Sequence, residues 1–298
     1  MPRRLAKRAA AFSPDLVHFH GLSLPLPLRW LQRALPGTPV LAQDHGGSPH
    51  SGWRGAVSRW GLAAVDAVAF TSRAMVRPFQ ETGYLGPRVS VFEVLESSSR
   101  FTPGDQAVAR TKTGLSGDPC VLWVGRLNSN KDPLTVLDAV SEALTRCPAL
   151  RLWCCFAEAP LVDAVQARLA GEPRLRSCVH LVGQVPHELL QDYYRAADIF
   201  VLGSKREGSG YALLEALASG LTPVVTDIPA FRRITRDGAV GTLSPVGDSA
   251  AMSRALVAVA SADRDGLRRN ARTHFDRALS FDVIGKELRA AYRTIVGP

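Results

Sequence analysis

The sequence predicts an α/β fold in which parallel sheets have helices between their strands. From residue 15 onward, short runs of β-branched and aliphatic residues alternate with longer helical stretches, the pattern of βαβ units. The 298 residues are 46% hydrophobic and 21% charged, enough for a large core and closer to two domains than to one. Between residues 100 and 117 the composition changes to proline, glycine, threonine and charge. We therefore expect two Rossmann-like domains, at 1–104 and 105–280.

The first region contains fewer elements than the second. Its basic opening is expected to form part of a helix, and the other elements follow from the hydrophobic pattern. Strands are expected at 15–20, 39–42, 67–71 and 89–94, and helices at 26–35 and 53–64.

The second region supplies a complete set of elements. Strands are expected at 120–124, 151–156, 179–182, 199–202 and 223–226, and helices at 133–146, 160–170, 187–196 and 211–219. Five strands joined by right-handed helical crossovers make a doubly wound domain. Beyond residue 241 the chain is expected to be mainly helical, at 248–261, 265–277 and 281–295. We expect residues 281–298 to form a terminal helix that crosses back onto the first domain, the alternative being an ordinary terminal helix.

Charge and cysteine content limit the classes of function. The formal net charge is +9, and residues 1–104 contain twelve basic and six acidic side chains. This excess suits either a solvated helix face or a surface for anionic phospholipid or an anionic acceptor. Nucleic-acid binding is not expected, because it would rest on charge alone. The five cysteines include no C-x-x-C pair, which favours reduced, buried thiols in a cytoplasmic protein and argues against zinc.

A glycine-containing loop between a buried strand and a helix, at 204–210, is the first candidate site. Gly208 and Gly210 allow the backbone to approach a ligand closely, and the N–H groups at the helix start suit a diphosphate. Glu207 precedes the helix and Glu215 lies about two turns along it, so both face one crevice. One carboxylate can bind sugar hydroxyls and the other a ribose diol; the alternative is two ordinary helical glutamates.

The second candidate site is the loop that follows the strand at 120–124. The strand leads into Gly125, and Arg126 and Lys131 precede the next helix. Fixed cations at the carboxyl end of a strand can stabilise the charge that builds on a leaving diphosphate. The alternative is a solvated turn with ordinary basic residues.

Four stretches together resemble glycosyltransferase family 4, the retaining sugar-nucleotide transferases. They are VLWVGRLNSNKDPLTVLDAV at 121–140, VHLVGQV at 179–185, YYRAADIFVLGSKREGSGYALLEALASGLTPVVTDIPAFRRI at 193–234 and GTLSPVGDSAAMSRAL at 241–256. The resemblance implies the GT-B fold, in which two Rossmann-like domains face a cleft. It also implies that the first domain is truncated, because the chain opens in what resembles the helix before the D-x-VH-x-H strand. The chain is then a fragment, a wrongly chosen start or half of a split enzyme.

The resemblance implies roles for individual residues. Arg126 and Lys131 would hold the donor diphosphate and Glu215 the ribose, while Glu207 would act at the donor sugar. The remaining donor-binding positions would be Gly125, Gly208, Ser209, Gly210, Tyr211 and Val185, the last beside the base. Ser209 stands where the family often has an aromatic residue, which leaves the sugar preference open.

Histidines in the first region form a further candidate group. DLVHFHG at 15–21 and AQDHGG at 42–47 resemble family strands, which implies that His45 contacts the donor sugar or acts in the transition state. A metal site is the alternative, because H-x-H places two imidazoles on one strand face. The histidines concerned are His18, His20, His45 and His50. We expect no metal, and a buried hydrogen-bonded role for His18 or His20.

The sequence therefore predicts a retaining transferase that moves a sugar from a nucleoside diphosphate sugar to a hydroxyl acceptor without metal or other cofactor. The leaving phosphate would help to deprotonate the acceptor. Glycan, polysaccharide or glycolipid synthesis is expected, with a lipid-linked or small acceptor and peripheral contact with the inner membrane face. The alternatives are a catalytically silent nucleotide-sugar-binding fragment and a related sugar-nucleotide epimerase or phosphorylase.

Overall fold

The computed structural model describes residues 2–297 and confirms an α/β fold with two parallel, Rossmann-like sheets. The chain divides into two compact units. The first contains the residues up to Ser97 together with those from Phe281, and the second contains Ser98–Ser280. The division thus lies seven residues before the expected boundary at 104, because Ser98 already donates a hydrogen bond to the carbonyl of Leu279 in the second unit.

The first unit is built on a four-stranded parallel sheet in the order β1-β2-β3-β4. Its strands are β1 (Val17–His20), β2 (Val40–Gln43), β3 (Ala67–Phe70) and β4 (Ser90–Glu93). Its helices are α1 (Pro2–Ala10), α2 (Pro25–Ala34), α3 (Gly52–Leu62), α4 (Arg73–Glu81) and α14 (Phe281–Val296).

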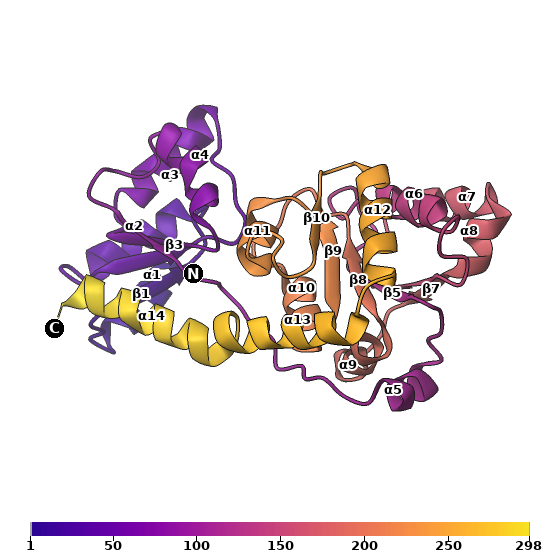
Figure 1. Ribbon diagram of the computed structural model, residues 1–298. Helices are drawn as coiled ribbons and strands as arrows, with labels where there is room; N and C mark the ends of the chain where they lie inside the picture. The colour runs from indigo at the N-terminus through magenta and orange to yellow at the C-terminus, as the bar shows by residue number, and fades with distance from the viewer. Residues whose placement is uncertain (1, 298) are drawn as a thin grey trace. The chain divides into compact units, whose positions relative to one another are not determined.

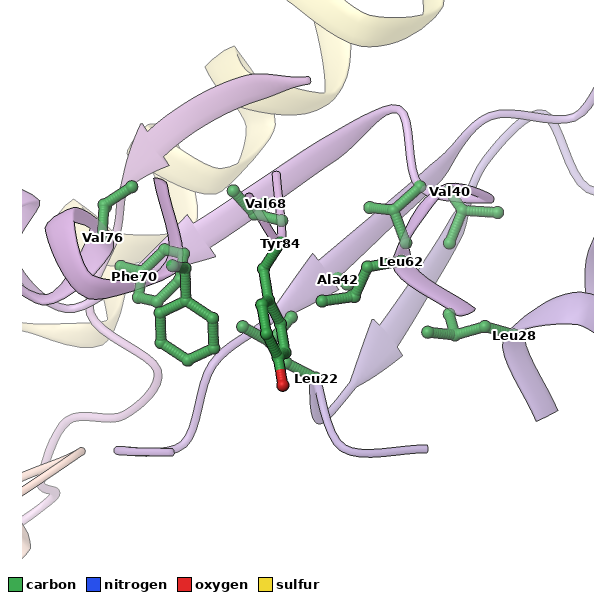
Figure 2. Close-up of a cluster of buried hydrophobic side chains, with 11 residues drawn as sticks. Leu22, Leu28, Val40, Ala42, Leu62, Val68, Phe70, Val76 and Tyr84 are labelled. Atoms are coloured by element: carbon green, nitrogen blue, oxygen red, sulfur yellow. The ribbon is translucent and has the colours of Figure 1, made fainter. Parts of the chain in front are cut away.

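Alternate residues of these strands enter two different cores. On one face Val68 and Phe70 pack with side chains from α2, α3 and α4 (Figure 2). On the other face Leu41, Ala67 and Ala69 contact Leu288, Tyr292 and Ile295 of α14. Helix α14, yellow in Figure 1, therefore completes the first unit from the far end of the sequence.

The second unit contains a six-stranded parallel sheet in the order β10-β9-β8-β5-β6-β7. Its strands are β5 (Cys120–Val124), β6 (Arg151–Cys155), β7 (Val179–Gly183), β8 (Ile199–Leu202), β9 (Thr222–Thr226) and β10 (Thr242–Ser244). Its helices are α5 (Gln106–Thr113), α6 (Pro133–Ala143), α7 (Val162–Ala170), α8 (Pro173–Cys178), α9 (His187–Ala196), α10 (Tyr211–Ala218), α11 (Pro229–Thr235), α12 (Ser249–Ala260) and α13 (Arg264–Ala278). β8 and β9 are buried along their whole length, as expected for a parallel sheet covered on both faces.

Four elements of the second unit were not expected: the helices α5, α8 and α11 and the strand β10. Helix α5 lies in the stretch that was expected to be irregular. At the start of this helix, Asp105 accepts a hydrogen bond from the Val108 amide, and Gly114 in the left-handed conformation ends the helix. Strand β10 extends the expected five-stranded sheet to six, and its three residues are too few to show a strand pattern.

Asp198 fixes α5 to the sheet. Its carboxylate is 8% exposed and accepts hydrogen bonds from the Cys120 amide at 2.8 Å, from Gln106 at 2.9 Å and from Arg110 at 2.9 Å. A buried carboxylate with this many donors stabilises the fold only while all of them remain. The start of β5, and hence the loop that follows it, is positioned by this residue.

Candidate functional site

The carboxyl ends of β5 and β8 form the place where a parallel sheet of this kind binds ligands. β5 is the first strand of the second sheet and pairs with both β6 and β8, so the strand order reverses on either side of it. Ligands bind beyond the carboxyl ends of strands at such a switch point. Both loops singled out in the sequence begin here.

Backbone contacts join these two loops directly. Asn130 donates from its side-chain amide to the carbonyl of Arg206 at 2.9 Å and accepts from the Lys205 amide at 2.8 Å. Lys205 also pairs with Asp132 at 3.4 Å. A Cβ atom at Gly203 would lie 2.9 Å from the carbonyl oxygen of Asp132, so only glycine permits this approach. The loops therefore form one unit.

Lys131 and Glu207 form an ion pair across the joined loops. The Lys131 ammonium donates to Oε1 of Glu207, and the side chains are 18% and 12% exposed. Two residues selected separately in the sequence are thus brought into contact at the switch point. Because water screens a partly buried pair little, the attraction between the two charges stays strong. This attraction holds both side chains in place.

Helix α10 begins beside this pair without a side-chain cap. Gly210 precedes it in the left-handed conformation, with φ 64°, and offers no side chain to the first N–H groups. The amides of Tyr211 and Ala212 lie in the first turn and have no acceptor within the helix. Gly208 and Ser209 form the loop that leads into it, and Tyr211 is exposed. Such a helix start attracts an anion.

Glu215 lies farther along α10 and is oriented by a tyrosine. The hydroxyl of buried Tyr194 donates to Oε2 of Glu215 at 2.9 Å, and the His187 ring lies 4.0 Å from Oε1. Burial raises the pKa of Glu215, an effect that the hydrogen bond from Tyr194 opposes. Because the carboxylate is 15% exposed and is held by one neighbouring donor, its remaining lone pairs can accept from a diol.

A hollow of about 200 Å³ lies at the ends of β5, β6 and β7. Its lining is mostly apolar and consists of Val124, Gly125, Cys155, Phe156, Ala157, Gln184, Val185 and Leu190. Gly125 and Val185, which the resemblance gives to the donor, thus line the same hollow. Arg126 is placed differently from Lys131: its guanidinium lies 3.4 Å from Glu158, and both side chains are more than half exposed.

In the first unit, three of the four candidate histidines form two hydrogen-bonded groups at the end of β1, while the fourth, His50, is exposed and contacts Tyr84 only through its backbone carbonyl among the described side-chain contacts. His18 contacts the Tyr292 hydroxyl at 2.7 Å and Gln43 at 3.0 Å. His20 lies 3.1 Å from Nε2 of His45, and the other ring nitrogen of His45 contacts Glu96. The structure therefore places His45 in a cluster rather than alone, and its contact with a donor sugar stays a prediction.

Two properties of residues 2–297 bear on metal binding and on insertion into a membrane. Within these residues, no group of three or more His, Cys, Asp or Glu side chains is placed to hold a metal ion. No helix in this range is long and apolar enough to cross a membrane.

Tyr194 and Glu96 are site residues that sequence reasoning missed. Tyr194 carries a weak signal, since a tyrosine on the buried side of an amphipathic helix needs a partner for its hydroxyl. Glu96 carries no local signal, because it follows β4 in an irregular segment and lies 51 residues from His45.

The two Rossmann-like units, with this arrangement at the carboxyl edge of the second sheet, define the GT-B class of glycosyltransferases. Comparisons of sequence agree with the fold. Residues 1–92 match the profile described as Glycosyltransferase Family 4, and residues 118–262 match the profile described as Glycosyl transferases group 1. The chain belongs to glycosyltransferase family 4.

The relatives that match this chain are longer than it is. It is 30% identical over 274 residues to D-inositol 3-phosphate glycosyltransferase of Nocardia farcinica, an alignment of 86% of this chain and 60% of the relative. It is 28% identical over 267 residues to GDP-mannose:cellobiosyl-diphosphopolyprenol alpha-mannosyltransferase of Xanthomonas campestris, covering 86% and 68%. The Anabaena protein HepE, solved with UDP and glucose, has the same fold, with a TM-score of 0.74 at 16% identity over 97% of this chain and 80% of that one.

Proposed function

We propose that the chain transfers a sugar from a nucleoside diphosphate sugar to a hydroxyl acceptor, with retention at the sugar carbon and without a metal ion. The observation that carries this proposal is the Lys131–Glu207 pair beside the uncapped start of α10. Few ligands need a cation, free backbone amides and a carboxylate within one crevice, and a sugar diphosphate needs all three. HepE, with the same fold, was solved with UDP and glucose.

The geometry supports a division of roles at this crevice. Lys131 and the first-turn amides of α10 would bind the diphosphate and stabilise its charge as it leaves. Glu207, already hydrogen-bonded to Lys131, would accept hydrogen bonds from the sugar hydroxyls. Glu215 would bind the ribose, and the hollow lined by Gly125 and Val185 would receive the base. The leaving phosphate would take the proton from the acceptor, so the mechanism needs no protein nucleophile.

Calorimetric titration with UDP, GDP and ADP, first without metal and then with magnesium, tests the donor site. Micromolar binding of one nucleotide that is weakened in Lys131→Met and unchanged by magnesium supports the proposal. Arg126→Met separates the two cations, because Arg126 must leave Glu158 before it can hold a diphosphate. A folded chain that binds none of the three nucleotides contradicts the proposal.

Product analysis separates the proposed reaction from its alternatives. With labelled UDP-glucose or GDP-mannose, and D-inositol 3-phosphate as the acceptor probe suggested by the Nocardia relative, transfer with retention gives a glycoside of unchanged anomeric configuration. An epimerase changes the sugar without acceptor, and a silent binding fragment leaves the donor intact. Either outcome replaces the proposed activity.

We further propose that the first unit contacts an anionic membrane surface through α3, which suits a lipid-linked acceptor such as that named for the Xanthomonas relative. Trp53, Val57 and Trp60 lie at i, i+4 and i+7 on one exposed face, and the two tryptophans are 74% and 44% exposed. Arg54 lies over Trp53 and Arg29 over Trp60. Exposed tryptophan beside arginine is typical of a membrane interface.

Vesicle sedimentation tests this surface. We expect the chain to bind phosphatidylglycerol vesicles, not phosphatidylcholine vesicles, and to lose binding in Trp53→Ser/Trp60→Ser. Leu189→Ser is the matched control, because Leu189 is 55% exposed on the second unit. Equal binding by the tryptophan variant and the control contradicts the proposal.

A further inference from the structure

Two histidines on one face of β1 have different hydrogen-bonding states. His18 and His20 are two positions apart in the strand, so their side chains lie on the same face. Their rings stack with centroids 4.6 Å apart. The amide nitrogen of Gln43 is directed at the carbonyl of Val94, so its oxygen faces His18 and accepts from Nε2. Nδ1 of His18 then accepts from the Tyr292 hydroxyl. Both nitrogens of His18 are therefore used within the fold.

Glu96 sets the protonation of the second group. Its side chain is 1% exposed and its carboxylate contacts Nδ1 of His45. When Glu96 is ionised it only accepts hydrogen bonds, and Nδ1 of His45 then carries the proton. Burial and the adjacent His20 lower the pKa of His45, which favours the neutral ring. Nε2 of His45 is then an acceptor, and Nδ1 of His20, 3.1 Å away, must donate to it.

This order leaves one ring nitrogen unused. When the neutral ring of His20 donates from Nδ1, its Nε2 is an unprotonated acceptor. Among the described residues, none is hydrogen-bonded to Nε2 of His20, and the residue is exposed. It lies at the last position of β1, at the carboxyl edge of the first sheet. The neighbouring carboxylate of Asp44 is held by the amides of Gly46 and Gly47.

We propose that Glu96, His45 and His20 form one oriented chain of hydrogen bonds whose last atom, Nε2 of His20, accepts a hydrogen bond from a substrate hydroxyl. This inference rests on the proposed transfer reaction for the identity of that hydroxyl, which belongs to the donor sugar or to the acceptor. Glu96 and His45 are positioning residues in this arrangement. It differs from the expectation for His45, because both nitrogens of that ring are engaged within the chain.

Nitrogen NMR of the full chain labelled with ¹⁵N-histidine tests the orientation without any ligand. We expect the proton on Nδ1 in His45 and His20 and on Nε2 in His18. Glu96→Leu should release His45 and His20 from this single tautomer and leave His18 unchanged as the internal control. If Glu96 were instead protonated, the order would reverse and His20 would carry its proton on Nε2, which overturns the proposal. The wild-type spectrum decides this even if the variant does not fold.

His20→Asn tests the contact with substrate. Asparagine retains a donor for Nε2 of His45 and removes only the atom that faces the substrate. The matched control is His50→Asn, because His50 is exposed in the same segment and has no side-chain partner in this cluster.

The assays use UDP-glucose, UDP, GDP-mannose and GDP, with the acceptor probe of the product analysis. We expect unchanged affinity for the nucleotides and a fall of about tenfold in kcat/KM. If the hydroxyl belongs to the sugar, the extra affinity of nucleotide sugar over nucleotide is lost. If it belongs to the acceptor, the KM for the acceptor rises instead. Wild-type values throughout overturn the contact. If the wild-type chain binds no nucleotide, the proposed function fails and the NMR result still decides the orientation.

Discussion

The two sheets present different chemistry at equivalent edges. At the carboxyl edge of the second sheet, Lys131 and Glu207 form a partly buried ion pair beside an uncapped helix start. At the carboxyl edge of the first sheet, His20 hydrogen-bonds His45, which contacts the Glu96 carboxylate, and His18 hydrogen-bonds Gln43 and Tyr292. The first arrangement suits a ligand with formal charge, and the second suits hydroxyl groups. The carboxyl edges of the two sheets thus carry different kinds of side chain.

The largest expected effect comes from removing the cation at the charged edge. Lys131→Met leaves the Glu207 carboxylate, 12% exposed, without its partner. We expect affinity for the bound nucleoside diphosphate to fall about 30-fold or more, and the free energy of unfolding to fall by about 2 kcal/mol. Calorimetry and urea denaturation measure the two quantities.

Lys205→Met is the control for this substitution. Lys205 pairs with Asp132 on the same joined loops but is 49% exposed, so its loss should cost less than about 1 kcal/mol. Equal losses of affinity in the two variants would show that the loops bind through general positive charge and not through Lys131.

Ionic strength sharpens the contrast between the edges. Raising salt from about 0.05 M to about 0.5 M should weaken nucleoside diphosphate binding several-fold, because the ligand and its cation are only partly desolvated. The ratio of kcat/KM between wild type and His20→Asn should stay constant, since that contact carries no formal charge. A ratio that changes with salt in parallel with nucleotide affinity would contradict the assignment of a neutral His20.

The pH dependence of stability tests Glu215. Burial raises its pKa above the ordinary value of 4.5, so the folded chain keeps this proton at pH values where the unfolded chain has lost it. The stabilising contribution is present below pH 4.5 and is lost as the pH rises through the raised pKa. Urea denaturation across this range should show the loss in wild type and not in Glu215→Gln. Parallel curves for the two proteins would contradict a raised pKa.

The smallest effect is expected at Tyr292, whose hydroxyl hydrogen-bonds His18 in the first sheet. Tyr292→Phe removes the donor to Nδ1 of His18 and should lower the free energy of unfolding by about 1 kcal/mol. Thr294→Val, on the same helix, removes a hydroxyl that donates to the carbonyl of Ala290 and should change it by less. A cost for Tyr292→Phe no greater than that of the control would show that packing alone holds α14 at this point.

The sequence predicts those elements of the fold that have a clear hydrophobic pattern. β5 and β8 were expected at the residues where they occur, because a fully buried parallel strand is a continuous apolar run between polar loops. β10 escapes this reasoning because three residues at a sheet edge show no periodicity. The missed α5 carried usable signals, since aspartate and glycine stand at its two ends.

The site was predictable in its parts but not in its contacts. Lys131 and Glu207 each stood out because they follow a buried strand, yet they lie 76 residues apart and only the strand order brings them together. The link between Glu96 and His45 depends on the order of the first sheet in the same way. Local sequence pattern predicts which loops lie at the candidate site, while tertiary contacts determine which charged side chains pair.

Helix α14 also imposes an order on the synthesis of this chain. Leu41, Ala67 and Ala69 leave the ribosome early, but the side chains that cover them, Leu288, Tyr292 and Ile295, emerge only after the whole second unit. The apolar residues on one face of the first sheet therefore stay uncovered while the second unit is synthesised. Nascent chains of this topology should depend on chaperones at that stage, and the second unit should acquire protease resistance before the first.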